Sequence, residues 1–222
     1  MPVLLGHVVP NFKADTTIGP IDFHDFITSE PGKWVILFSH PADFTPVCTT
    51  ELSAFQKIQP ELEKRNVKPI ALSVDSVDSH KAWAGDIVAY GKCNDFTIPI
   101  IADVSKEVAN AYGMMDPDEM DSQGMPLTAR SVFIIGPDKK LKLSLLYPAT
   151  TGRNVTEVLR VIDSLQLTAN KKVCTPVNWE MGQDVIVPPS VSAEDAAKMF
   201  PDTKTVELPS GKGYLRVTSQ PK

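Results

Sequence analysis

Trp34-Val-Ile-Leu-Phe38 runs directly into Ser39-His-Pro-Ala-Asp-Phe-Thr-Pro-Val-Cys48-Thr-Thr-Glu-Leu52, and this stretch decides the fold. Its first five residues are apolar without interruption, which predicts a buried strand. Apolar residues then recur near helical spacing at positions 52, 55, 58 and 62, which predicts a helix over residues 45–65. Cys48 therefore lies at a junction between a strand and a helix.

The first turn of that helix is a favourable place for a reactive thiol. Thr45 suits the N-cap position and Pro46 suits the first helical position, so Cys48 falls in the first turn. The free N–H groups and the positive end of the helix dipole stabilise a negative charge there. Because the thiolate is the nucleophilic form of cysteine, the residues alone predict an activated Cys48.

The composition limits the classes of function. The chain has 222 residues, of which 42% are hydrophobic and 22% are charged, and this is typical of a soluble globular protein. The net charge is −5 and no basic cluster is longer than two lysines, so we expect no nucleic-acid partner. The first residues resemble no signal peptide and no apolar run reaches membrane-spanning length, so we expect no integral membrane association.

The cysteines stand apart from one another. Cys48, Cys93 and Cys174 form no CxxC pair, which argues against a disulfide scaffold and against a zinc module. Individually placed thiols favour a cytoplasmic protein. An organelle that is reached without a cleaved signal stays open as an alternative.

Strand and helix patterns alternate along the chain up to residue 169. The patterns predict strands over residues 68–74, 98–102, 130–135 and 141–147, and helices over residues 76–90, 105–112 and 154–167. Residues 1–33 predict turns with short strands, and residues 113–128 predict a loop. Because the alternation ends in a hairpin around residues 136–140, we expect an α/β fold, a three-layer sandwich with a mixed sheet.

The sequence changes in character near residue 169. Six prolines occur after it, and only residues 192–200 predict a helix, with a small hairpin over residues 208–217. We therefore predict a main domain over residues 1–169 and a small Pro-rich C-terminal domain over residues 170–222. This segment has too little apolar material for a core of its own, and we expect an arm that lies on the main domain or on a second subunit.

The pattern Pro41-x-x-x-Thr45-x-x-Cys48, together with Arg130 at the start of a later strand, resembles the active site of the peroxiredoxins. The runs 40–52, 136–143 and 147–154 and the Pro-rich tail are similar to the one-cysteine, peroxiredoxin-6-like class. The resemblance implies a thioredoxin-like fold, a homodimer and a thiol-dependent peroxidase. Its partners would be a hydrogen peroxide or organic hydroperoxide substrate, including phospholipid hydroperoxides, and an external thiol of the glutathione or thioredoxin type. This chemistry requires no cofactor and no metal.

The residues suit peroxide reduction. The Cys48 thiolate would attack one peroxide oxygen and become a sulfenic acid. Arg130 is always charged and offers donors in a fixed fork, so it would stabilise the thiolate and hold the peroxide. The Thr45 hydroxyl can orient the substrate, and Pro41, which has no N–H, can shield the pocket from water.

Three further residues belong to the site by resemblance. Glu51 and Arg153 would fix Arg130, and His40 would line the pocket. Each has a plainer interpretation, because Glu51 and Arg153 also suit an ordinary ion pair and His40 suits a buried structural histidine. Cys93, near the end of a predicted helix and without an evident base, is interpreted as an inert packing residue.

Cys174 has two interpretations. It lies about where two-cysteine peroxiredoxins carry the resolving cysteine, so an intermolecular Cys48–Cys174 disulfide is one hypothesis. A surface cysteine without a role is the other.

Some proteins of the resembled class also have phospholipase A2 activity, which is attributed to a Ser-His-Asp set. His24 and Asp138 match two of those positions, but Lys33 occupies the serine position, so this activity is not expected. A binding or chaperone-like protein is a further alternative. A thiol-disulfide oxidoreductase is disfavoured because the chain has no CxxC.

Overall fold

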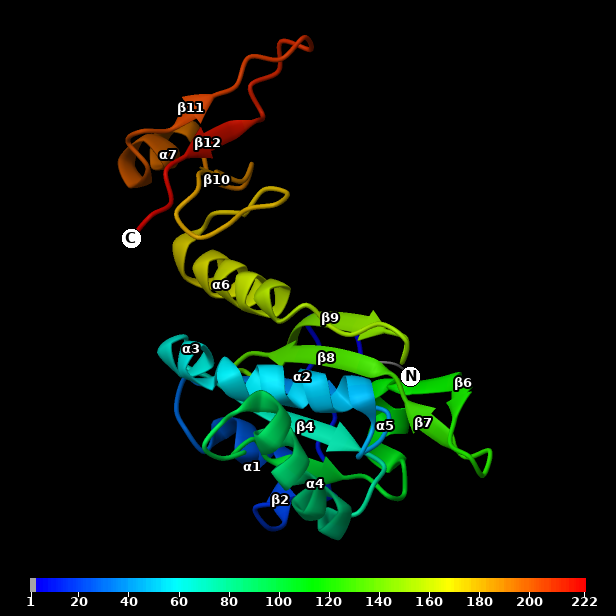
Figure 1. Ribbon diagram of the computed structural model, residues 1–222. Helices are drawn as coiled ribbons and strands as arrows, with labels where there is room; N and C mark the ends of the chain where they lie inside the picture. The colour runs from blue at the N-terminus through cyan, green and yellow to red at the C-terminus, as the bar shows by residue number, and fades with distance from the viewer. Residues whose placement is uncertain (1–2) are drawn as a thin grey trace. The chain divides into compact units, whose positions relative to one another are not determined.

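The computed structural model describes residues 3–222 and shows two compact units, Met1–Val155 and Thr156–Lys222 (Figure 1). The predicted turns and short strands near the N-terminus lie within the described residues, except for residues 1 and 2, which fall outside them.

The first unit is built on a five-stranded sheet. Its order is β5 (Ile100–Ala102), β4 (Val67–Ser73), β3 (Trp34–Ser39), β8 (Arg130–Ile135) and β9 (Leu141–Tyr147). Strands β3, β4 and β5 run parallel, whereas β8 runs antiparallel to β3 and to β9. The expected mixed sheet and its closing hairpin are therefore confirmed.

Helices cover both faces of this sheet. Helices α2 (Pro46–Lys57) and α4 (Val77–Gly91) lie on one face (Figure 1), where Phe38 stacks on Phe55 with ring centroids 4.2 Å apart. On the other face, apolar residues of α1 (Phe23–Thr28) and α5 (Glu107–Tyr112) share a core cluster with Val35 and Leu37 of β3. Since neighbouring residues of a strand point to opposite faces, the continuous apolar run 34–38 serves both layers.

The predicted helix over residues 45–65 is two helices. Helix α2 ends at Lys57, Ile58 has non-helical dihedral angles, and α3 (Gln59–Lys64) follows. Pro60 explains the break, because it has no N–H to donate to the carbonyl of Gln56 and its ring clashes with that carbonyl in a continuous helix. The prediction of one continuous helix was wrong because it rested on apolar spacing alone and did not take this proline into account.

Two other short elements differ from the prediction. Residues 113–128 contain an antiparallel hairpin, β6 (Met115–Met120) and β7 (Pro126–Thr128), where the sequence indicated a loop. Near the N-terminus, β1 (Lys13–Ala14) pairs with β2 (Ile21–Asp22) as expected, but the helix α1 that follows was not predicted. Its six residues are too few to show a helical period, and its stability comes from buried Phe23 and Ile27.

The second unit has its own core, contrary to the prediction. Its elements are α6 (Val155–Lys171), α7 (Ala193–Met199) and a sheet in the order β10 (Val185–Ile186), β12 (Arg216–Thr218) and β11 (Lys204–Thr205). A buried cluster contains Val173, Trp179, Val185, Val187, Val191, Ala196 and Phe200. These residues are scattered among prolines without a period, so the sequence pattern did not reveal them. The predicted domain boundary between residues 169 and 170 stays a prediction.

Over residues 3–222, no helix combines the length and the apolar character that crossing a membrane requires.

Candidate active site

The loop between β3 and α2 places Cys48, in the first turn of α2, beyond the C-terminal end of the central strand β3. Pro46 occupies the first turn of α2 and Thr45 has extended N-cap dihedral angles, as predicted. The Thr45 hydroxyl does not cap the helix, however, because it donates to the carbonyl oxygen of Ala42 at 2.8 Å. Phe44 just before it has a φ of 53° although it is not glycine, so the loop holds a strained backbone next to the cysteine. Pro41 is buried in the same loop.

Arg130 directly contacts the cysteine sulfur. Its Nη1 donates to Cys48 Sγ at 3.3 Å, and Cys48 has an exposed fraction of 0%. The guanidinium is fixed from its other side, since Nε and Nη2 donate to the carbonyl oxygen of Ala149 at 2.8 and 2.6 Å. The structure thus places the predicted partner, Arg130, in hydrogen-bond contact with Cys48, and its catalytic role stays a prediction. The guanidinium offers the sulfur a charged donor in a fixed position.

Glu51 joins Arg130 to a second buried arginine. Its Oε2 lies 2.8 Å from Arg130 Nη1 and 2.7 Å from Arg153 Nη2. Its Oε1 accepts from the backbone N and from Nε of Arg153, at 2.7 and 2.9 Å. Arg153 Nη1 also donates to the carbonyl oxygens of Ser39 and Ser131, both at 2.8 Å. The network thereby ties α2 to the ends of β3 and β8.

The charges of this network stabilise one another. Burial alone would raise the pKa of Glu51, but the charges and hydrogen bonds of Arg153, together with Arg130, lower it overall. The Arg153 guanidinium also lies 5.2 Å from the ring centroid of Phe38 and 5.6 Å from that of Phe55. Glu51 therefore stays ionised and holds both guanidinium groups in place.

His40 belongs to a second buried network that the sequence did not predict. Its Nε2 lies 2.9 Å from Asp43 Oδ1, while Asp43 Oδ2 accepts from His80 Nδ1 and from Ser79 Oγ, both at 2.7 Å. The His40 ring also packs on Trp83, with centroids 5.2 Å apart. His80 and Trp83 lie on α4, some forty residues further along the chain, so no local motif could have marked them.

The protonation of His40 follows from its partners. Burial lowers the pKa of His40 despite the nearby Asp43 charge, so the ring is neutral at neutral pH. A carboxylate only accepts, so Nε2 carries the proton and Nδ1 keeps a free lone pair. Among residues 3–222, no group hydrogen-bonds this buried Nδ1. Burial would raise the pKa of Asp43, but hydrogen bonds from His40 and His80 lower it overall.

The His40, Asp43 and Asp75 ligand atoms lie within 4.8 Å of one another, which is close enough to hold a metal ion. The hydrogen bonds of these three residues explain why their side chains lie close together, and no metal ion is needed for this arrangement. Asp75 Oδ2 accepts from the backbone N of Asp43 at 2.9 Å and from Ser73 Oγ at 2.7 Å. We therefore interpret it as a polar network that shapes the loop.

The remaining predicted residues lie elsewhere. Cys93 is partly buried just after α4, and Cys174 is exposed in the second unit. No disulfide joins the three cysteines, all of which lie within residues 3–222.

The residues at the positions of the Ser-His-Asp set of phospholipase A2 activity have other partners. His24 Nε2 donates to the carbonyl oxygen of Val9 at 2.8 Å, and Asp138 pairs with Lys142 at 2.6 Å. Lys33 is paired with Glu30 at 2.6 Å. Each of the three side chains is thus engaged with a partner outside the set.

Comparison with known proteins defines the class. The AhpC/TSA family matches residues 5–144, and the C-terminal domain of 1-Cys peroxiredoxin matches residues 164–203. The chain therefore belongs to the peroxiredoxins, and it is a thiol-dependent peroxidase of their one-cysteine class.

Its relatives agree along the full length. Peroxiredoxin-6 of Gallus gallus is 61% identical over 223 residues, covering 99% of this chain and 98% of that protein. Peroxiredoxin-6 of Homo sapiens is 59% identical over 224 residues, with the same coverage of both chains. A crystal structure of a cysteine-to-serine variant of peroxiredoxin 6 from Arenicola marina has a TM-score of 0.96 at 57% identity, and 99% of both chains is covered.

A more distant solved structure is a yeast mitochondrial 1-Cys peroxiredoxin. Its TM-score is 0.87 at 48% identity, with 98% of this chain and 99% of that chain covered. The thiol resolving mechanism of that protein operates through glutathione/thioredoxin systems.

Proposed function

We propose that Cys48 is the thiol that reduces peroxide and that Arg130 is its catalytic partner. The observation that carries this proposal is the 3.3 Å contact from Arg130 Nη1 to Cys48 Sγ. The same Nη1 also donates to Glu51, while the other two guanidinium nitrogens donate to Ala149. Because the arginine is already fixed, it can stabilise charge in the transition state without reorganising.

The reaction proceeds by attack of sulfur on oxygen. The Cys48 thiolate forms a bond to one peroxide oxygen, the O–O bond breaks, and the second oxygen leaves and takes up a proton as water or an alcohol. The sulfur is oxidised to sulfenic acid and the peroxide is reduced. Arg130 balances the charge on the departing oxygen, and Thr45 orients the substrate with its hydroxyl. The free lone pair on His40 Nδ1 accepts a hydrogen bond from a peroxide O–H, and Pro41 restricts the entry of water.

An external thiol of the glutathione or thioredoxin type restores the enzyme. The thiol condenses with the sulfenic acid, water leaves, and a mixed disulfide forms. A second thiol then releases the Cys48 thiolate. The supporting observation is that the similar yeast mitochondrial protein resolves its thiol through these systems. Hydrogen peroxide and organic hydroperoxides are the proposed substrates, and phospholipid hydroperoxides are the largest of them.

Cys174 offers a second route, because it is exposed. In that route, Cys174 of another subunit attacks the sulfenic acid and releases water, which leaves an intermolecular disulfide with Cys48. We favour the external thiol, since the chain matches the one-cysteine C-terminal domain over residues 164–203.

One experiment separates these possibilities. The reduced protein is mixed with one equivalent of peroxide, its oxidation is followed by stopped flow, and the product is analysed by intact mass. We expect a monomer mass with one added oxygen on Cys48, and no peroxide consumption in Cys48→Ser. A disulfide-linked dimer that disappears in Cys174→Ser would support the second route. Peroxide consumption that survives Cys48→Ser would contradict the proposal.

The part of edge strand β9 beyond Leu141, whose backbone pairs with Gly6 and His7, suggests how a homodimer forms through the main sheet. β9 is the last strand of that sheet, and its Leu146 has an exposed fraction of 65%. An apolar edge strand pairs readily with a second copy. Leu146→Lys should shift the protein towards the monomer in sedimentation velocity, whereas an unchanged dimer would rule out this edge.

The domain bounds and the cellular location are also proposals. Residues 1–169 form the catalytic domain and residues 170–222 the C-terminal domain. The location is cytoplasmic, because a cycle that depends on an external thiol suits a reducing compartment. Fluorescence of the tagged protein in fractionated cells tests this location.

A further inference from the structure

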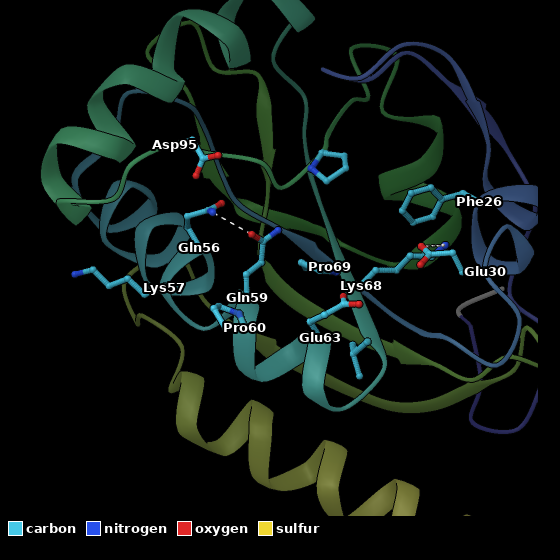
Figure 2. Close-up of a pocket in the computed structure, with 12 residues that line it drawn as sticks. Phe26, Glu30, Gln56, Lys57, Gln59, Pro60, Glu63, Lys68, Pro69 and Asp95 are labelled. Carbon is cyan, nitrogen blue, oxygen red and sulfur yellow. Dashed lines mark hydrogen bonds and ion pairs between the residues drawn. The ribbon is translucent and has the colours of Figure 1, made fainter.

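A cavity of about 620 Å³ lies at the end of α2 that is remote from Cys48. The C-terminal end of α2, the start of α3 and the start of β4 form its walls. Figure 2 shows Gln56 and Gln59 hydrogen-bonded on one side, at 3.0 Å, and Lys68 on the other. Pro60 and Pro69 give part of the wall an apolar character. Nothing in the peroxidase mechanism uses this cavity.

Lys68 is unusual among the cationic groups of this region because its ion pair is loose. Its Nζ donates to Ser29 Oγ at 2.8 Å and lies 3.5 Å from Glu30 Oε1. The ammonium is also 4.4 Å from the ring centroid of Phe26. Its side chain is only 11% exposed.

Lys33 provides a contrast within the same cluster. Its Nζ lies 2.6 Å from Glu30 Oε2 and 3.1 Å from Glu63 Oε2. These hydrogen bonds raise the pKa of Lys33, despite an opposing effect of burial. Burial lowers the pKa of Lys68, and the charge of Glu30 compensates only in part. Lys68 therefore offers more free amine than its neighbour, and a desolvated lysine is the usual partner of a carbonyl group.

The charges around the cavity select the ligand. The carboxylates Glu30, Glu63 and Asp95 are balanced by Lys57, Lys68 and the adjacent Lys33, so the cavity offers no net charge that would attract an ionic ligand. The apolar wall favours a compact hydrocarbon body, and the paired glutamine amides can accommodate a neutral polar group. A small neutral carbonyl compound meets all these conditions.

We propose that Lys68 captures small neutral aldehydes in this cavity as imines, a reaction separate from peroxide reduction. The ammonium first gives a proton to solvent. The amine nitrogen then bonds to the carbonyl carbon, a proton moves from nitrogen to the carbonyl oxygen, and water leaves as the C=N bond forms. No group is oxidised or reduced. The Ser29 hydroxyl, which lies 2.8 Å from Nζ, holds the amine at the cavity wall.

The test uses hexanal as the probe and the full-length chain at neutral pH. Sodium cyanoborohydride traps each imine as a stable secondary amine, and peptide mass mapping measures the adduct at every lysine. Because the cavity holds the aldehyde beside the Lys68 amine, we expect several-fold more adduct at Lys68 than at Lys64, which is exposed on α3 and does not line the cavity. Lys68→Arg should remove this excess and leave peroxide consumption unchanged.

Two controls test the cavity itself. Hexanol has a similar body without the carbonyl, so an excess of it should protect Lys68 and leave the labelling of Lys64 unchanged. Glyoxylate carries a negative charge and should label Lys68 no more than Lys64. Uniform labelling of the lysines by hexanal, or a lack of protection by hexanol, would overturn the proposal.

Discussion

A buried cation lies near each end of helix α2, and the two cations differ in how firmly their hydrogen-bond partners hold them. At the N-terminal end, Arg130 is held by Glu51, by Ala149 and by the Cys48 sulfur, all within 3.3 Å. At the other end, Lys68 has one hydroxyl partner and a carboxylate 3.5 Å away. The first cation is fixed in position and charge, whereas the second can lose its proton.

The difference follows from the chemistry of the two side chains. A guanidinium presents several donors in one plane and stays charged, so a peroxidase can use it to hold a thiolate and a developing oxyanion. An ammonium is a single point charge whose pKa responds strongly to burial. A fully paired network fixes a geometry, and a loosely paired amine leaves a reactive group.

Arg130→Lys tests most directly whether the fixed donors of the guanidinium, and not only its charge, are needed. A lysine retains the charge but cannot contact Sγ, Glu51 and the Ala149 carbonyl at the same time, so the sulfur loses its fixed donor. We expect kcat/KM for hydrogen peroxide to fall by about 10²–10³-fold, the usual loss for one preorganised donor. Stopped-flow oxidation measures it. Arg160→Lys, at a partly exposed arginine of α6 that pairs with Glu157, is the matched control and should stay near the wild-type value. A loss of less than twofold in Arg130→Lys would show that charge alone suffices.

Glu51→Gln tests the network that fixes the arginine. The amide leaves two buried guanidinium groups, Arg130 and Arg153, without their carboxylate. Because removing one member of a buried ion pair leaves an uncompensated charge, we expect the free energy of unfolding to fall by about 3 kcal/mol. Urea denaturation measures this change. Glu61→Gln removes exposed pairs with Lys64 and Arg65, which solvent screens, and should leave the free energy of unfolding close to that of the wild type. Equal losses in the two variants would contradict the network.

The same two ends of α2 show what the sequence could predict. At the N-terminal end, an apolar strand, Pro46 and Cys48 follow one another, so local chemistry placed the thiol correctly. Arg130 came from a resemblance rather than from a pattern, because it lies 82 residues from Cys48. The partners of His40 escaped prediction, since His80 reaches the loop only when α4 packs beside α2.

At the C-terminal end, the sequence was misleading or silent. The apolar spacing continued through Pro60 and hid the break at Ile58, because a pattern of side chains does not register a missing backbone N–H. The cavity beside it carries no motif, since its residues come from several elements. Similarly, the core around Trp179 was missed because its members are far apart in the chain and follow no period.

Asp43→Asn should change how stability depends on pH. The folded-state pKa of Asp43 lies below its ordinary value of 3.8. A lowered carboxylate pKa contributes stability that is fully present above the unfolded value and is lost as the pH falls towards the folded value. The wild type should therefore exceed Asp43→Asn by about 2 kcal/mol at pH 7, and this difference should shrink as the pH falls below about 5.

Urea titrations at pH 7, 4, 3 and 2.5 measure the difference. Asp86→Asn, an exposed position on the same α4 that carries His80, is the control and should follow the wild type throughout. His40 acts in the same direction at higher pH, because its lowered pKa means that protonation below 6.5 favours the unfolded chain. A difference between wild type and Asp43→Asn that stays constant from pH 7 to 2.5 would contradict the proposed charge pairing.

Thr97→Val should have the smallest effect and tests whether the cavity end of α2 is as loosely held as Lys68 suggests. The Thr97 hydroxyl donates to Gln59 Oε1 at 2.8 Å and accepts from Gln56 Nε2 at 3.4 Å, both in an exposed position, while its backbone N donates to Gln56 Oε1 at 3.0 Å and is retained in the variant. Since a hydrogen bond contributes about 1 kcal/mol and water can replace both of these exposed ones, we expect a loss below about 1 kcal/mol in urea denaturation. Peroxide consumption should not change. A loss comparable to that of Glu51→Gln would mean that both ends of α2 depend on tight polar networks. The contrast between the firmly paired Arg130 and the loosely paired Lys68 would then not extend to the surrounding side chains.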